Sequence, residues 1–504
     1  MFRAIMRTPG LFLLCLASIP AQSSGLPQTD SLALKSQRAK QLMAEGNFAQ
    51  AIPLYRELNQ AVPNNPGLML NLGMALQMAG KKGEAISELE AAVKLDPRLS
   101  PAWLFLGTAR LQLGETTAAV EALNMLLDLQ PDHREARQML AGALLSLDRI
   151  EEATRQYQKL TEFDPENSQA WYGLGRSYEA LASHAFDKLQ EAAPQSSYSL
   201  SLLAETRLRG QQFSSAFYLY RRALEEKPAL RGLHKAVAGI YRQTGHPDWA
   251  DAEEKKESQL PSPECPSPAL ECHYQAGHYS ELITAAKEDN TADSFYWRSR
   301  AYNELAINAF TRLGQLTPSA ELRELKARIY NSQKKYSEAA GEWREALKLS
   351  PTSAEIEKQL AISLKLGQDY GAALPLLQDL LRQQPASAEL NYLVGDTLLD
   401  LQRVEEAIPL LKRAVIRDPK FLPAHKSLAR ADLAAGKPVE AIPHLKAALP
   451  TDDDGSVHYQ LARAYQATGQ TELAKPVMAD YQRIQRSATQ AKERTMQEVE
   501  ITAP

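Results

Sequence analysis

The chain has 504 residues, of which 44% are hydrophobic and 23% are charged. This composition is ordinary for a soluble protein and excludes a disordered or fibrous chain. At roughly 100 to 200 residues per domain, the length alone predicts about three globular domains. The net charge of −4 argues against nucleic acid as the main partner, because a phosphate backbone requires a concentrated basic surface.

Residues 1–21 have the pattern of a secretory signal peptide. Arg3 and Arg7 precede an apolar run at residues 11–19, and small residues follow this run. The run is far shorter than the roughly 20 residues that cross a bilayer as a helix, and no later stretch is longer. A lipoprotein site at Cys15 is the alternative, but two leucines stand where such a site has small residues. We therefore expect an exported protein, periplasmic or secreted, with no membrane span.

A 34-residue period runs through most of the chain. Prolines recur at this spacing at Pro63, Pro97, Pro131 and Pro165, and again at Pro351, Pro385 and Pro419. Alanines recur at Ala51, Ala85, Ala119 and Ala153, and again at Ala339, Ala373, Ala407 and Ala441. This period replaces the domain count, because repeat arrays do not divide into globular units.

Each unit is predicted to be a pair of helices. In residues 67–97, apolar side chains keep helical spacing on two segments that Gly80 separates, and Pro97 closes the second segment. Small residues such as Gly73 fall where the two helices must approach closely. Several units carry a proline near the start of the second helix, which we expect in the first turn, where no backbone hydrogen bond is lost. These prolines are Pro53, Pro375, Pro409, Pro443 and Pro476.

The units resemble tetratricopeptide repeats, a family of 34-residue helix-turn-helix motifs. The family pattern of large, small and closing residues is present at Trp103, Leu106, Gly107, Ala119, Leu123, Leu126 and Pro131. It is present again at Tyr336, Ala339, Trp343, Ala346 and Pro351. The resemblance covers about two thirds of the chain and implies an all-α fold, an α-solenoid of stacked hairpins that forms a right-handed superhelix.

The period is lost after residue 183 and returns at Ala320, because residues 184–194 are too short for a standard second helix. We read the irregular middle either as a joint between two arrays or as an insertion that makes a partner site, and the sequence leaves both open. The predicted parts are an N-terminal array (32–183), degenerate helical repeats (184–319) with a proline-rich connector (261–268), a C-terminal array with a capping helix (320–490) and a flexible tail (491–504).

Cys265 and Cys272 are the cysteines that remain after signal cleavage. In an exported chain such a pair is expected to form a disulfide, with free thiols as one alternative. The nearby His273 and His278 make a zinc site a second alternative, although the spacing does not match compact zinc motifs. We predict the disulfide, and neither a metal nor another cofactor.

The sequence contains no HExxH, GxSxG, phosphate-binding glycine loop or dinucleotide fingerprint. Helical hairpins take up every long segment, so we predict that the protein is not an enzyme. The resemblance implies a protein–protein interaction scaffold that binds a partner protein or peptide in a concave groove, and the signal peptide places it in the cell envelope. The alternatives are an accessory protein of polysaccharide export and a metalloprotein centred on residues 265–278.

The resemblance also implies which residues line the groove. The family binds through the first helix of each repeat, which gives an apolar set in the N-terminal array and a basic set in the C-terminal array, with ordinary packing or a solvated charged face as the alternatives. Leu70, Pro101 and Phe105 stand where chaperone-binding members have polar or basic residues, so that function is not transferred. The predicted groove residues are Leu70, Met74, Met78, Lys426, Arg430 and Arg463.

Overall fold

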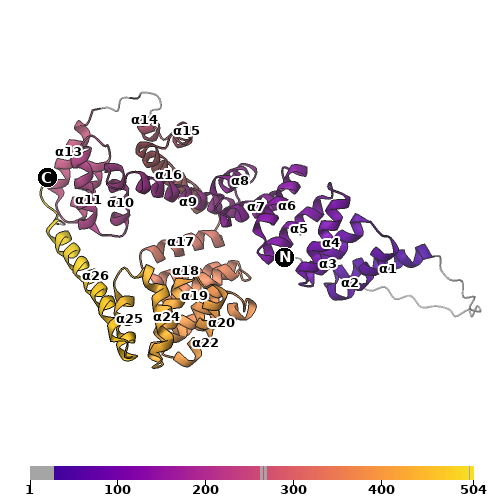
Figure 1. Ribbon diagram of the computed structural model, residues 1–504. Helices are drawn as coiled ribbons and strands as arrows, with labels where there is room; N and C mark the ends of the chain where they lie inside the picture. The colour runs from indigo at the N-terminus through magenta and orange to yellow at the C-terminus, as the bar shows by residue number, and fades with distance from the viewer. Residues whose placement is uncertain (1–27, 262–264, 266–269, 499) are drawn as a thin grey trace, which may run out of the picture. The chain divides into compact units, whose positions relative to one another are not determined.

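The computed structural model describes residues 28–261, 265, 270–498 and 500–504 (Figure 1). The predicted signal peptide and most of the proline-rich connector lie outside these ranges. All regular structure in the described residues is helical, with no strand among them, which confirms the predicted all-α fold. The chain divides into two compact units, one ending at Leu147 and one beginning at Asp148.

The first unit is a row of helices in which each helix packs against the next. Its core contains fully buried leucines, among them Leu72, Leu76, Leu89 and Leu106. These helices are α1 (Gln28–Ala44), α2 (Phe48–Ala61), α3 (Pro66–Met78), α4 (Lys82–Leu95), α5 (Ser100–Leu113), α6 (Thr116–Leu129) and α7 (Arg134–Ser146).

The recurring glycine of the first helix sets how closely the two helices of a hairpin approach. A Cβ atom added at Gly73 would lie 2.6 Å from Cγ of Leu89, and one at Gly107 would lie 2.9 Å from Cγ of Leu123. Both distances are shorter than any van der Waals contact. The glycine therefore lets a large side chain of the second helix rest directly on the backbone of the first.

The second unit continues the same pattern with an interruption. Its first helices are α8 (Ile150–Phe163), α9 (Ser168–Ala192), α10 (Ser197–Arg209), α11 (Phe213–Glu226), α12 (Leu233–Gln243), α13 (Pro247–Gln259), α14 (Leu270–Gln275), α15 (Tyr279–Ala285) and α16 (Ala292–Gln315). The later ones are α17 (Ala320–Ser332), α18 (Tyr336–Leu349), α19 (Ala354–Leu366), α20 (Tyr370–Gln383), α21 (Ala388–Asp400), α22 (Val404–Arg417), α23 (Leu422–Ala434), α24 (Pro438–Ala448), α25 (Ser456–Ala467) and α26 (Thr471–Glu498).

The helix that follows α9 in the chain, α10, is not its partner in a repeat hairpin. Helix α9 runs without a break through residue 184, where the sequence analysis placed the end of the N-terminal array, and it packs along α16 (Figure 1). The hydroxyl of Ser299 in α16 donates to the carbonyl oxygen of Ala182 in α9 at 3.0 Å, across 117 positions of sequence. The hairpin partner of α9 is thus supplied from a distant part of the chain.

The second half of α16 carries the second-helix pattern of a repeat. Ala306, Phe310, Leu313 and Pro318 have the same mutual spacing as Ala85, Leu89, Ala92 and Pro97. Ala306 and Leu313 are buried, and a Cβ atom at Gly175 of α9 would lie 2.7 Å from Cδ1 of Phe310. Phe310 therefore occupies the place that Leu89 has opposite Gly73, so α9 and α16 form one interrupted repeat.

The part of the chain between these two helices, residues 193–291, is called the insert, and its described residues form helices α10 to α15. Helix α10 packs on α9 and α16, and α14 and α15 pack on α16. One core joins these helices with α11 to α13 and includes Leu189, Tyr220, Tyr241 and Tyr296. After α16 the array resumes, because α17 packs against α9. The loss of period in the middle of the chain thus corresponds to an insertion within a repeat.

The prolines of the second helices lie deeper than we predicted. Each is the sixth residue of its helix, in the second turn, so each removes the hydrogen bond to the carbonyl group four residues earlier. The helices continue past them because all five proline side chains are exposed, on a face where water can solvate the freed carbonyl group. They are Pro53, Pro375, Pro409, Pro443 and Pro476.

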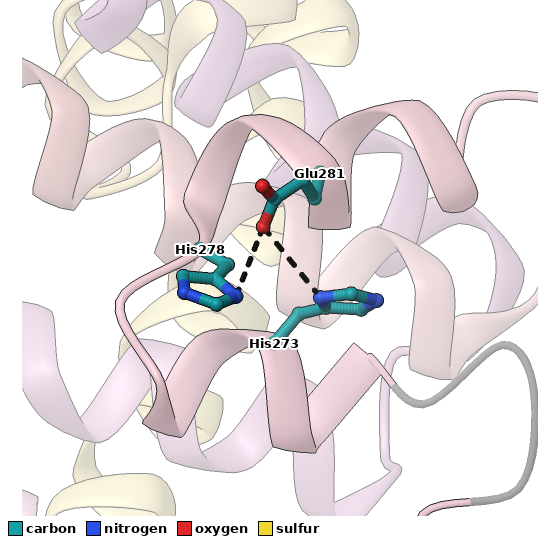
Figure 2. A group of neighbouring side chains, drawn as sticks. All are labelled: His273, His278 and Glu281. Carbon is teal, nitrogen blue, oxygen red and sulfur yellow. Dashed lines mark ion pairs between the residues drawn. The ribbon is translucent and has the colours of Figure 1, made fainter.

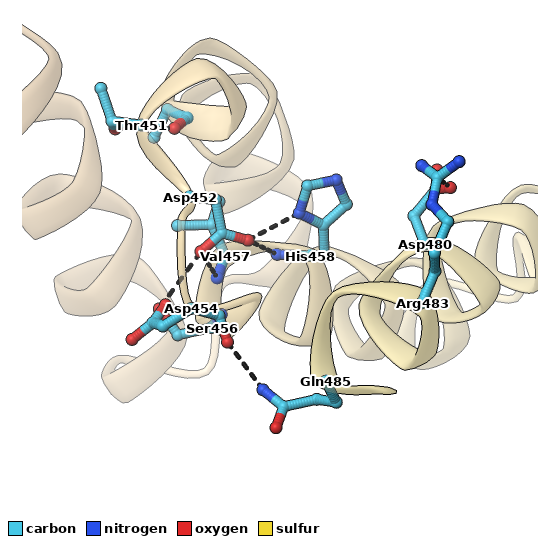
Figure 3. A network of polar contacts seen from close by, with 10 residues as sticks. Thr451, Asp452, Asp454, Ser456, Val457, His458, Asp480, Arg483 and Gln485 are labelled. Carbon is cyan, nitrogen blue, oxygen red and sulfur yellow. Dashed lines mark hydrogen bonds and ion pairs between the residues drawn. The ribbon is translucent and has the colours of Figure 1, made fainter. Parts of the chain in front are cut away.

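A network of polar contacts fixes the last hairpin, α25 with α26 (Figure 3). The buried carboxylate of Asp452 accepts hydrogen bonds from the backbone N–H groups of Val457 and His458, at 3.0 and 2.8 Å, and lies 2.6 Å from Nδ1 of His458. Gln485 of α26 donates to the carbonyl oxygen of Asp454 at 2.7 Å. These contacts cap α25 and determine the direction in which α26 leaves the array.

The packing of α9 on α16 predicts the effect of a single added methyl group. Gly175→Ala should lower the free energy of unfolding by about 1–3 kcal/mol, the usual cost of overpacking, because the new Cβ atom overlaps the ring of Phe310. The additional change Phe310→Leu should recover part of this loss. Urea denaturation of the two single variants and the double variant measures the coupling. Strict additivity would contradict the contact.

Candidate functional site

A hollow of about 480 Å³ lies where the insert leaves the array. Four helices line it: α9, α10 of the insert, α16 and α17. Its charged side chains are Arg176 and Glu179 from α9, Glu205 and Arg209 from α10, and Arg328 from α17. We call this hollow the branch pocket.

Residues of the branch pocket share a helix position with the predicted groove residue Met74. Arg176 and Arg328 are the ninth residues of α9 and α17, as Met74 is of α3 and Thr108 is of α5. Glu205 holds the same position in α10. Helix α10 thus adds its own residue at this position to the lining that α9, α16 and α17 provide.

The charges of the branch pocket are incompletely paired. Glu179 accepts from Arg176 at 3.1 Å and from Arg328 at 3.2 Å. Glu205 lies 3.8 Å from Arg300. Burial raises the pKa of both Glu179 and Glu205 above the ordinary value, although the neighbouring arginines oppose this shift. Burial therefore opposes ionisation of these two carboxylates.

One donor in the branch pocket lacks an acceptor. Nη1 of Arg328 is buried and has no hydrogen-bond partner in the described part of the chain. A buried donor left unpaired costs about 1–3 kcal/mol, and a carboxylate is the acceptor that best fits a guanidinium group. The lining of the branch pocket thus includes an arginine with one donor that the described chain does not satisfy.

The predicted apolar residues of the N-terminal groove divide into buried and exposed side chains. Leu70 is 9% exposed and belongs to the core of the first unit, and Met74 packs partly against that core. Met78 is 52% exposed. Of the three, Met78 offers the most surface to a partner, and the binding role of all three stays a prediction.

The predicted basic residues of the C-terminal array do not form a uniform stripe. Arg430 lies 3.0 Å from Asp396 and 2.9 Å from Asp400. Lys365 binds the same two carboxylates at 2.7 and 3.0 Å. Burial alone would lower the pKa of Lys365, but its bonds with Asp396 and Asp400 raise it overall. The first helices of three successive repeats are thus joined by alternating charges.

Lys426 and Arg463 are exposed, and the guanidinium carbon of Arg463 lies 5.9 Å from the centre of the Tyr459 ring. Arg430 is paired with two aspartates. The predicted basic set therefore does not act as one positive stripe, and Lys426 and Arg463 are positive charges apart from Arg430. Their contact with a partner stays a prediction.

The predicted cysteine pair lies next to a histidine cluster. Cys265 and Cys272 are joined as a disulfide, with Cα atoms 6.0 Å apart, so their sulfur atoms do not serve as thiolate ligands here. Nδ1 of His278 and Nδ1 of His273 lie 3.0 and 3.9 Å from the same oxygen of Glu281 (Figure 2).

One ligand atom from each of these three side chains lies within 4.8 Å of the others. Two imidazoles and a carboxylate are a ligand set that zinc accepts. The alternative metal site predicted from sequence had two cysteines and two histidines as ligands. In the structure, Glu281 rather than either cysteine completes the group with the two histidines. All three side chains are partly or largely exposed.

Family models of the tetratricopeptide repeat match two parts of the chain. One model matches residues 42–107, 79–141 and 111–177, and another matches residues 359–420. The chain contains tetratricopeptide repeats in these ranges. The matched ranges do not include the insert. Repeats of this family form protein-interaction scaffolds.

The relatives share parts of the repeat array. The heat-shock protein cognate co-chaperone sgt12 of Aspergillus fumigatus is 33% identical over 84 residues, which are 17% of this chain and 24% of the relative. The chain thus spans about a quarter of that relative's length.

Two solved structures are similar at low identity. A tetratricopeptide repeat protein from Parabacteroides merdae is 16% identical, with 66% of this chain and 99% of that one covered and a TM-score of 0.32. MamA from Desulfovibrio magneticus is 22% identical, with 29% and 84% covered and a TM-score of 0.28. No described helix is both long enough and apolar enough to cross a membrane.

The contact between α9 and α17 predicts a pH dependence of stability. Burial first, and repulsion from Glu321 second, raise the pKa of Glu324 in α17 to about 7. Between its unfolded pKa near 4.5 and this value, the folded chain holds a proton that unfolding releases, so rising pH lowers the free energy of unfolding.

Glu324→Gln should therefore stabilise the protein by about 1–2 kcal/mol at pH 8, allowing for partial exposure, and by little at pH 4.5. Urea denaturation at both pH values checks this, with the exposed Glu338→Gln as control. An equal effect of Glu324→Gln at both pH values would refute the assignment.

Proposed function

We propose that the protein is a non-catalytic scaffold that binds a partner protein through an acidic segment, with a carboxylate of that segment in the branch pocket. The observation that supports this proposal is that Arg328, a residue of the pocket lining, has a buried Nη1 without an acceptor in the described chain. Arg176 and Arg209 add two further guanidinium groups to the same pocket wall. An aspartate or glutamate side chain supplies both the acceptor and the compensating charge.

The neighbouring surface determines how the rest of the segment binds. The ninth residue of successive first helices changes from Met74 and Thr108 in the first unit to charged residues around the branch pocket. Beyond them, Asp396 and Arg430 in the C-terminal array pair with each other. The branch pocket gathers three arginines, Arg176, Arg209 and Arg328, with the two carboxylates Glu179 and Glu205.

Selection of peptides tests this proposal without a known partner. Random peptides displayed on phage and selected on the full chain should be enriched in aspartate and glutamate. Binding of the selected peptides should fall about tenfold or more for Arg328→Gln, because a charge-assisted hydrogen bond contributes roughly 1.5–3 kcal/mol. The exposed Arg413→Gln on α22 is the matched control. Peptides without acidic enrichment, or binding equal in both variants, would refute the branch pocket as the site.

We further propose that the protein works in the cell envelope. The predicted signal peptide at residues 1–21 supports export. The pairing of Cys265 with Cys272 supports an oxidising compartment, because such bonds are rare in the cytosol. A repeat scaffold of this kind fits the assembly of envelope proteins, which meet as extended or incompletely folded segments.

The intact mass of the protein purified from its native host checks both parts of this proposal. We expect a chain that lacks about the first 21 residues and is two daltons lighter than after reduction. A chain that still contains residues 1–21, with both thiols free, would contradict the envelope location.

A further inference from the structure

The segment Glu500–Pro504 contacts the insert, although it follows α26 of the last hairpin. The side chain of Ile501 packs against the core of the insert. The hydroxyl of Tyr241 in α12 donates a hydrogen bond to the carbonyl oxygen of Thr502 at 2.6 Å, across 261 positions of sequence. Two independent contacts, one apolar and one polar, thus hold the segment in the same place.

Aromatic rings from three consecutive helices surround this contact. Tyr241 is fully buried. Its ring centre lies 5.5 Å from that of Phe217 in α11 and 5.5 Å from that of Trp249 in α13. Trp249 in turn stacks on His246 at 4.0 Å. The position of the Tyr241 hydroxyl is therefore fixed by packing before any ligand arrives.

The tyrosine hydroxyl explains why a peptide backbone binds here. A buried tyrosine requires an acceptor for its proton, and Thr502 supplies a backbone carbonyl group. Burial also raises the pKa of Tyr241, which keeps the hydroxyl protonated as a donor. Glu500, Thr502, Ala503 and Pro504 are exposed, whereas Ile501 is partly buried. Recognition therefore depends on one apolar side chain and one backbone carbonyl group.

We propose that Phe217, Tyr241 and Trp249 form a binding site for a short extended peptide, and that its ligand is the segment Glu500–Pro504 of the same chain. The ligand class is a peptide with a branched apolar residue, here Ile501, followed directly by the residue whose backbone carbonyl group accepts from Tyr241, here Thr502. This site is separate from the branch pocket, so it does not rest on the proposed function.

The last hairpin delivers the segment to this site. The bond from Gln485 to Asp454 (Figure 3) fixes α26 on α25, and α26 continues from Thr471 to Glu498. A helix of 28 residues extends about 42 Å at 1.5 Å per residue. Attachment in one chain gives the segment a high effective concentration, so one apolar side chain and one hydrogen bond suffice. The segment links the insert to the end of the C-terminal array.

Hydrogen exchange in the full chain tests the proposal. The amides of α11 to α13 should exchange about tenfold faster in Ile501→Ser than in the wild type, because loss of the bound segment frees these helices to open. Ala503→Ser, an exposed change two residues away, is the control and should leave exchange unchanged. Tyr241→Phe keeps the ring, removes the hydroxyl and should give an intermediate increase.

A synthetic peptide of residues 498–504, added at millimolar concentration, should restore the slow exchange of Ile501→Ser. The same peptide with serine in place of Ile501 should not. Equal exchange in the wild type and Ile501→Ser would overturn the site. A dimer of the wild type in sedimentation, lost in Ile501→Ser, would overturn the assignment to the same chain, because the segment would then bind a second copy.

Discussion

The packing of α9 on α16 is the contact on which the rest of the structure depends. Gly175 lets the ring of Phe310 rest on the backbone of α9, and Ser299 bonds to the carbonyl group of Ala182 further along. The first half of α9 and the second half of α16 complete one repeat. The second half of α9 and the first half of α16 hold the insert. A repeat array tolerates such an insertion because each repeat contacts only its neighbours, provided that the interrupted hairpin still closes.

The insertion explains why the branch pocket exists. The first helices of a regular array expose one side to solvent, and charges at neighbouring repeats then pair with each other, as Asp396 and Arg430 do. At the branch, α10 replaces solvent beside α9 and α17 and brings Glu205 and Arg209 to the same hollow. Burial there raises the pKa of Glu179 and Glu205. The same insert presents Tyr241 to the segment after α26, which makes it a second contact surface.

The repeated hairpins could be predicted from sequence because glycine, alanine and proline recur at physically required positions. The interrupted repeat could not be found by the same search, because Pro318 precedes Pro351 by 33 residues, one fewer than the period, and its first helix lies far upstream. The spacing from Ala306 to Pro318 equals that from Ala85 to Pro97 and was the available signal. Arg176 and Arg328 could have been found from the sequence, because they occupy the same helix position as Met74 in their repeats. Their proximity to Arg209, and the packing of Ile501 on the insert, depend on tertiary contacts that the repeat pattern does not contain.

Cross-linking measures the central claim, that α9 and α16 form one hairpin, most directly. Glu166, just before α9, and Arg312 of α16 form an ion pair at 2.7 Å. In the variant Glu166→Cys with Arg312→Cys, a short bismaleimide should join the two peptides in high yield, as read by mass spectrometry after digestion. The variant Glu166→Cys with Arg344→Cys is the control. A yield for the first pair no higher than for the control would show that α16 does not complete the repeat that α9 begins.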